Sequence, residues 1–106
     1  MENVKIAFAE KVWENPRRGV YQKIFTDGNR RIRVLRFEYG FVEHDWCTKG
    51  HIGYVLSGKM TIDFNGVLKT FSQGDGLWIE AGEACKHKVI IKEGEMAELV
   101  RFEEEN

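Results

Sequence analysis

The stretch KMTIDFNGVLKTF, residues 59–71, decides the fold class. Met60, Ile62 and Phe64 alternate with polar residues, which is typical of a strand with one buried face. The pair Asn65-Gly66 follows at once and favours a two-residue hairpin turn, because both central residues of a type I′ turn need a positive φ. Residues 67–71 then form the return strand. We therefore expect an antiparallel hairpin in the middle of the chain.

The same strand-and-turn pattern extends in both directions from this hairpin. Residues 20–26 and 31–39 are strand-like on either side of Asp27-Gly28-Asn29, which predicts a second hairpin. Further strands are expected at residues 4–8, 51–56, 77–79, 85–91 and 96–102, turns at 57–58 and 74–76, a loop at 15–19 and a solvated tail at 103–106. No apolar residues recur at helical spacing, so about eight short strands predict an all-β antiparallel sandwich or barrel.

Composition limits the classes of binding partner and the cellular compartment that we expect for this protein. A chain of 106 residues is one domain, 1–106, that can fold without disulfide staples. The net charge of -1 gives no general attraction to nucleic acid, and no apolar run is long enough to cross a membrane. The N-terminus is too charged for a secretory signal, so we expect a cytoplasmic protein. Cys47 and Cys85 are then expected to be reduced, a disulfide between them being the alternative.

Arginines cluster in the first third of the sequence. Arg30, Arg31 and Arg33, with Arg17 and Arg18, form either a small basic patch or solvated strand edges and turns. We interpret them as solvated.

Metal-ligating side chains concentrate just before the central hairpin. His44, Asp45, Cys47 and His51 fall within eight residues, and thiolate, imidazole and carboxylate are the groups that bind first-row divalent metals. Asp45 and Cys47 share a face of an extended backbone, because side chains alternate with a period of two. This stretch predicts a metal site.

A second cluster lies downstream, in Cys85-Lys86-His87. Cys85, His87 and the apolar residues 89 and 91 share one face of the expected strand, while lysines occupy most of the other. Because the lysine face prefers water, the His87 face is expected to point inward, toward the upstream cluster.

At this point the sequence resembles the cupin superfamily, whose members are small antiparallel double-stranded β-helix barrels of the jelly-roll kind. The resemblance covers about residues 31–102, and its best-matched segments are residues 54–58 (YVLSG) and 74–82 (GDGLWIEAG). In that family the first motif supplies two His and a Glu before its closing Gly, and the second motif supplies another His. The resemblance therefore implies a metal site built from two distant strands.

Counting along those motifs assigns candidate ligands. Counting back from Gly58 puts the Glu position on His51 and the two His positions on Asp45 and Cys47, and counting forward from Gly82 puts the last position on Cys85, with His87 two residues further along the same face. We rank Cys47, His51 and His87 as the core set. Asp45 or His44 is the candidate fourth ligand, and Cys85 competes with His87.

The mixed sulfur and nitrogen donor set favours zinc, and it also accommodates iron, nickel or copper. Trp46, Tyr54 and Trp78 are expected to line the cavity or the core, whereas Glu43 and Glu80 have no clear reason to point inward.

Two functions follow as hypotheses. The first is a small metal-dependent enzyme, an isomerase, lyase or dioxygenase, acting on a small organic molecule. The second is a module that binds or senses a small ligand or metal without turnover, or keeps a degenerate empty site. The resemblance also implies a homodimer, with residues 1–12 as the exchanged or augmenting strand.

Overall fold

The computed structural model describes residues 4–104, and its regular structure is almost entirely β. The elements are η1 (Phe8–Glu10), β1 (Glu14–Arg17), β2 (Val20–Asp27), β3 (Arg30–Glu38), β4 (His51–Phe64), β5 (Val67–Ser72), β6 (Gly76–Ile79), η2 (Glu83–Cys85), β7 (Lys88–Ile90) and β8 (Met96–Glu104). Both η elements are single turns of 3₁₀-helix, and there is no α-helix among the described residues. The predicted all-β class is confirmed.

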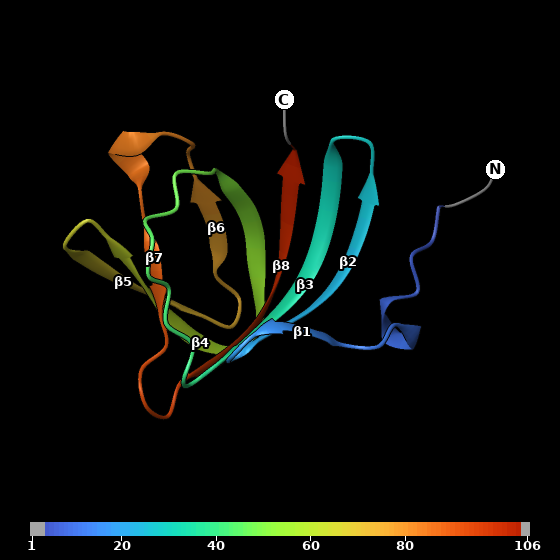
Figure 1. The fold of residues 1–106 in the computed structure, drawn as a ribbon, viewed down its shortest axis with the longest axis horizontal. Coiled ribbons are helices and arrows are strands. Elements are labelled where there is room, and N and C mark those ends of the chain that lie inside the picture. The colour runs from blue at the N-terminus through green and yellow to red at the C-terminus, as the bar shows by residue number, and fades with distance from the viewer. Residues whose placement is uncertain (1–3, 105–106) are drawn as a thin grey trace.

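All strand pairs are antiparallel and belong to one curled sheet. Its strands follow the order β1-β2-β3-β8-β4-β5, while β6 pairs with the first residues of β4 and β7 pairs with residues near its end. Figure 1 shows the sheet bent into a trough, with β2, β3 and β8 in one wall and β5, β6 and β7 in the other. The two expected hairpins are present as β2–β3 and β4–β5, and Asn65 and Gly66 both have positive φ.

Strand β4 joins the two walls, and along its length the positions that face inward change from odd-numbered to even-numbered residues. His51 and Val55 are buried in its first half, and Met60 and Ile62 are buried in its second half. The change from odd to even positions coincides with a bulge, because Val55 pairs with Leu99 whereas Ser57 already pairs with Glu98. One extra residue in a strand shifts every later side chain to the opposite face. The bulge thus keeps both halves of β4 directed into the trough.

The core fills the floor of the trough with aliphatic and aromatic side chains from β2, β3, β4, β6, β7 and β8 and from the segments that follow β3 and β7. Its buried members are Val20, Leu35, Phe37, Phe41, Val55, Met60, Ile62, Leu77, Ile79, Val89, Ile91, Ala97 and Leu99. The inward residues of β3, such as Leu35 and Phe37, are two apart, as the pleat requires.

Several expected elements differ from the structure. The turn expected at residues 57–58 is part of β4, because the bulge absorbs the positive φ of Gly58 without ending the strand. The loop expected at 15–19 instead begins with β1, which pairs with β2. The strand expected at 85–91 is shortened to β7, since η2 occupies Glu83–Cys85.

The two chain ends also differ from expectation. No strand forms at residues 4–8, where η1 begins instead, and residues 1–3 lie outside the described part of the chain. The tail expected to be solvated at 103–106 continues β8 as far as Glu104, while residues 105–106 are likewise outside the description. Within residues 4–104, no helix is both long and apolar enough to span a bilayer.

The bulge generates the first prediction. A Cβ at Gly58 (φ +73°) would overlap the Met96 carbonyl on β8, whereas a Cβ at Gly28 (φ +62°) would meet nothing within 4 Å. We expect Gly28→Ala to lower the free energy of unfolding by about 1 kcal/mol through the positive φ alone. Gly58→Ala should lower it by about 3 kcal/mol or more, because a backbone clash is added.

Urea denaturation followed by tryptophan fluorescence measures both values. Equal losses in the two variants would contradict the proposed role of Gly58 in the bulge.

Candidate metal centre

A cavity of about 380 Å³ opens into the trough above the apolar floor. Its polar lining comes from the segment 43–49, from the start of β4, from the residue before β7, and from β3 and β8. The polar and charged members are Arg17, Arg31, Arg33, Glu43, His44, Asp45, Cys47, Lys49, His51, His87, Arg101 and Glu103. The arrangement places most of the candidate ligands predicted from the sequence against one space.

Cys47 is held at this cavity by backbone pairing. Its N–H donates to the carbonyl of His87 at 2.9 Å, and its carbonyl accepts from the N–H of His87 at 3.0 Å. This isolated bridge fastens the loop between β3 and β4 to the chain just before β7. The loop is fastened a second time where Thr48 accepts from the N–H of Gly82 at 2.8 Å. The position of the thiol therefore does not depend on a bound ion.

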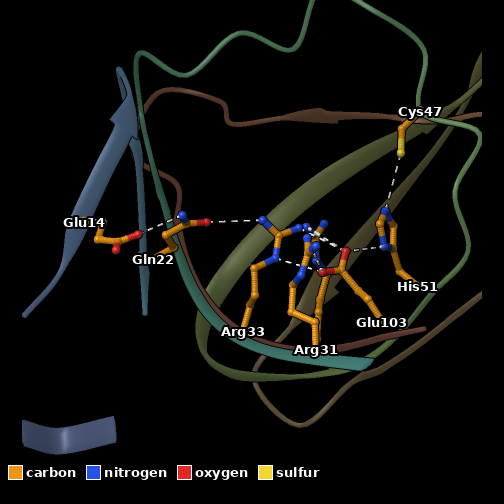
Figure 2. A network of polar contacts seen from close by, with 8 residues as sticks. Glu14, Gln22, Arg31, Arg33, Cys47, His51 and Glu103 are labelled. Carbon is orange, nitrogen blue, oxygen red and sulfur yellow. Dashed lines mark hydrogen bonds and ion pairs between the residues drawn. The ribbon is translucent and has the colours of Figure 1, made fainter. Parts of the chain in front are cut away.

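His51 is the first residue of β4 and points into the cavity with only 5% of its surface exposed. Its Nε2 lies 3.5 Å from the Sγ of Cys47. On the other side of the ring, Nδ1 lies 3.6 Å from Oε2 of Glu103 on β8, as Figure 2 shows. The ring is therefore oriented between a thiol and a carboxylate.

His87 completes the group and is 2% exposed. Its Nδ1 donates to the Cys85 carbonyl at 3.1 Å, which fixes the tautomer and leaves Nε2 bare, buried and without a hydrogen-bond partner. The rings of His51 and His87 lie edge to face with centroids 5.1 Å apart. One ligand atom from each of Cys47, His51 and His87 lies within 4.8 Å of the others, and this is a group able to hold a metal ion.

These three residues fit a zinc-sized ion. Zn–S and Zn–N bonds of about 2.3 and 2.0 Å at a tetrahedral angle place sulfur and nitrogen about 3.5 Å apart, in agreement with the Cys47–His51 distance. A buried polar atom without a partner costs about 1–3 kcal/mol, and a metal ion bound by His87 Nε2 removes that penalty. Both imidazoles also have an oxygen near Nδ1, the usual outer partner of metal-binding histidines.

Electrostatics favour the metal-binding states of His51 and Cys47, whereas they shift His87 toward its protonated form. Burial, reinforced by the positive charge of Arg101, lowers the pKa of His51 to about 3, so its ring is neutral at physiological pH. The pKa of the Cys47 thiol is lowered, chiefly because its interaction with the nearby His87 ring favours the thiolate. Burial by itself lowers the pKa of His87, but interactions with Cys47 and the Cys85 carbonyl outweigh it and raise the pKa. Thiolate and neutral imidazole are the forms that ligate metal ions.

The other predicted ligands are placed differently. His44 and Asp45 line the same cavity, but both are exposed and neither belongs to the three-residue group. The side chain of Cys85 does not line the cavity, because η2 turns the chain there, and its carbonyl instead orients His87. Both cysteines are free. Of the two competing residues, His87 and not Cys85 lies in the group able to hold a metal ion.

Of the three aromatic residues predicted to line the pocket, only Trp46 does so. Tyr54 and Trp78 are 49% and 73% exposed, and that prediction is wrong for them. Inward positions of β4 and β6 are those of His51, Val55, Leu77 and Ile79, so Tyr54 and Trp78 project from the outer face. Large apolar residues occupy both faces of these strands, and the sequence pattern does not distinguish the faces.

Glu43 is a cavity residue that the sequence pattern does not single out. Its Oε1 accepts from the N–H of Val89 at 3.1 Å, and this bond holds the carboxyl on the cavity wall. Burial raises the pKa of Glu43 above its ordinary value. A carboxyl with a raised pKa inside a cavity is suited to exchanging protons with a ligand.

The prediction that the arginines are solvated is wrong for Arg31 and Arg33. Both point inward from β3, and Arg101 points inward from β8. The sequence carries a signal for this, because Arg31 and Arg33 continue the parity of the core residues Leu35 and Phe37. Glu103, expected in the solvated tail, forms a bidentate pair with Arg33 at 2.9 and 3.0 Å.

Comparisons with known proteins identify the fold. Neither a protein-family model nor a curated protein sequence matches this chain. Among solved structures it is similar to the polyketide cyclase RemF from Streptomyces resistomycificus, with a TM-score of 0.79 and 15% identity over 94% of this chain and 78% of that one. It is also similar to an RmlC-like cupin from Shewanella frigidimarina, with a TM-score of 0.71 and 16% identity over 98% and 91% of the two chains.

A third similar structure is the EutQ protein of Clostridium difficile, with a TM-score of 0.66 and 17% identity. The match covers 80% of this chain and 61% of that protein, so this chain spans less than two thirds of its length. At these identities the likeness concerns the fold. The chain has the cupin fold, and the resemblance seen in the sequence motifs is confirmed at that level.

Proposed function

We propose that this protein binds a divalent transition metal, zinc first, through Cys47, His51 and His87, and that it acts as a metal-dependent isomerase or lyase on a small organic molecule in the cavity. The observation that carries the proposal is the convergence of the three donor atoms within 4.8 Å. Three protein ligands are the usual number in catalytic zinc sites, which keep one position for water or substrate.

Residues of this chain supply the remaining chemistry. A bound zinc would act as a Lewis acid on a substrate carbonyl. Glu43 stands on the wall of the same cavity with a raised pKa, which suits it to take a proton from the carbon beside that carbonyl and return it elsewhere. Trp46, Leu77 and Ile79 supply apolar surface in the same cavity.

The donor set and the nearby carboxyl favour proton transfer over oxygen chemistry. A thiolate ligand is readily oxidised, which disfavours a dioxygenase. A carboxyl able to act as general acid or base argues for an enzyme over a module that only binds.

The metal ligands can be tested by substitution. We expect about one zinc per chain in protein purified without chelator or metal-affinity resin. Cys47→Ala, His51→Ala and His87→Ala should each weaken zinc binding more than about 100-fold, since even outer-shell changes cost 10–100-fold. Elemental analysis gives the stoichiometry, and competition with a chromophoric chelator gives the affinity.

Matched controls exist for both residue types. Cys85→Ala removes a thiol outside the group, and His44→Ala removes an exposed imidazole, so both should retain zinc. Circular dichroism establishes that each variant is folded. Full zinc content in all three ligand variants would reject the assignment.

Catalysis is tested separately through proton exchange. Zinc-loaded protein, incubated in D₂O with a panel of small carbonyl compounds, should incorporate deuterium next to the carbonyl of at least one compound, as NMR detects. Glu43→Gln should retain zinc and lose the exchange, because the amide cannot accept the proton. Exchange that is the same with and without zinc would exclude the proposed mechanism.

The expected homodimer also has a candidate surface. An outer-face row runs through paired positions Trp78, Ile52, Phe102, Ile32 and Phe25, from β6 to β2. Three of these side chains are 46–73% exposed, namely Ile52, Phe102 and Trp78. Large exposed apolar rows on a sheet are typical of interfaces, and a second copy of the chain supplies an equal row in a two-fold pair. We propose this face as the dimer contact, in place of a strand exchanged by residues 1–12.

Light scattering coupled to size exclusion measures the oligomeric state. The unaltered protein should be dimeric, and Phe102→Lys should shift it to monomer. Val67→Lys changes a residue that is also exposed but lies on β5, away from the row, so it should remain dimeric. A monomeric unaltered protein at high concentration would remove the proposal.

A further inference from the structure

We propose that Arg31, Arg33 and Arg101 bind the oxyanion group of a small organic acid. We call these three residues the arginine wall; they lie beside the metal group, which is Cys47, His51 and His87. The proposal deepens the proposed function, because it assigns a chemical class to the molecule that reaches the same cavity. It rests on charge and contacts that are independent of any metal.

The wall is built on paired positions of neighbouring strands. Arg31 lies opposite Glu103, and Arg33 lies opposite Arg101, across the β3–β8 ladder. Gly53 of β4 pairs with Arg101 on the other side, and a Cβ there would overlap the carbonyl of Val100 on β8. The missing side chain at Gly53 therefore lets β4 pair closely with the strand that carries Arg101.

Positive charge is in excess within this wall. Glu103 is the only carboxylate that ion-pairs with the three arginines among the described residues, and it contacts Arg31 at 3.9 Å, Arg33 at 2.9 Å and Arg101 at 3.6 Å. Three guanidinium groups thus share a single carboxylate partner. Figure 2 shows the carboxylate of Glu103 between the arginines and the ring of His51.

The donors on the wall are not all used. Each nitrogen of the Arg33 guanidinium makes a hydrogen bond, since two of them bind Glu103 and the third donates to Gln22 at 3.2 Å. In contrast, the Nε atoms of Arg31 and Arg101 are buried without a hydrogen-bond partner. Burial lowers the pKa of Arg101 to about 10, which leaves it charged at neutral pH but poorly solvated.

These features have one shared explanation. Like charges on directly opposed strand positions destabilise a sheet, and so do buried donors without acceptors. An arriving oxyanion supplies both the missing charge and the missing acceptors, because the planar guanidinium matches carboxylate and phosphate oxygens. Since Glu103 also touches His51, a molecule held by the wall lies next to the metal group.

The test uses chelator-treated protein, so that its result does not depend on metal binding. Malonate and inorganic phosphate are the probes for the two oxyanion types, malonamide is the neutral analogue, and calorimetric titration at constant ionic strength measures affinity. We expect at least one anion to bind more than about tenfold tighter than malonamide. The stronger of the two identifies carboxylate or phosphate as the recognised group.

Variants distinguish the wall from general charge. Arg31→Gln and Arg101→Gln should each weaken the preferred anion about tenfold or more. Arg30→Gln removes the same charge from an exposed neighbour on β3 and should have little effect. Glu103→Gln should tighten anion binding severalfold, because it removes the competing carboxylate. If Glu103 only supported the fold, its substitution would not increase the affinity.

Equal affinity for malonamide and both anions, or equal effects of Arg30→Gln and Arg31→Gln, would overturn the anion proposal. Either result leaves the zinc measurements untouched. Conversely, anion binding by a protein that holds no zinc would sustain the arginine wall and reject the metal centre.

Discussion

The bulge between Val55 and Ser57 is the constraint on which the rest of the structure depends. Before it, β4 turns its odd-numbered residues inward and places His51 in the cavity, and after it the even-numbered Met60 and Ile62 enter the core. A strand without the extra residue would satisfy one of these sets and expose the other. One continuous strand, β4, can supply His51 to the metal group and also Met60 and Ile62 to the apolar floor. It can do so only because its inward-facing positions change from odd to even at the bulge beside β8.

Backbone hydrogen bonds determine how the group is assembled. Cys47 comes from a loop, yet its pairing with the backbone of His87 ties the thiol to the second wall of the trough. A carbonyl accepts a hydrogen bond from the His87 ring, and the carboxylate of Glu103 lies near the His51 ring. Such preorganisation means that little conformational entropy is lost when an ion binds. It also explains how ligand identities different from those usual in the cupin motifs can occupy the same frame.

Much of the fold and of the metal group is predictable from the sequence, and the failures have physical causes. The alternation around Asn65-Gly66 predicts the hairpin, and the spacing from Gly58 predicts that Cys47 and His51 lie in one group. The spacing from Gly82 points to Cys85, and only the shared face of the expected strand adds His87 to the group. Asp45 is overvalued by a pattern that assumes a shared strand face, because the chain forms an irregular loop there. Arg31 and Arg33 are expected in water because of their charge, although their strand positions match those of the core residues. Tyr54 and Trp78 are expected to point inward because they are aromatic, although their strand positions face outward. For the arginines and the aromatics, a general preference of the residue type conflicts with position in the pleat, and position prevails.

Arg33 facing Arg101 has a consequence for how this protein can change over time. Apolar replacements of this pair together with Glu103 would relieve repulsion and desolvation, so the fold alone gives no reason to retain these charges. Retaining these charges lowers the stability of the protein, and the function of the cavity is the reason to keep them. This is the usual trade-off between stability and activity. In a descendant that no longer needs the function of the cavity, substitutions are expected to accumulate first at this wall. Such a protein would become more heat-resistant as it lost its activity.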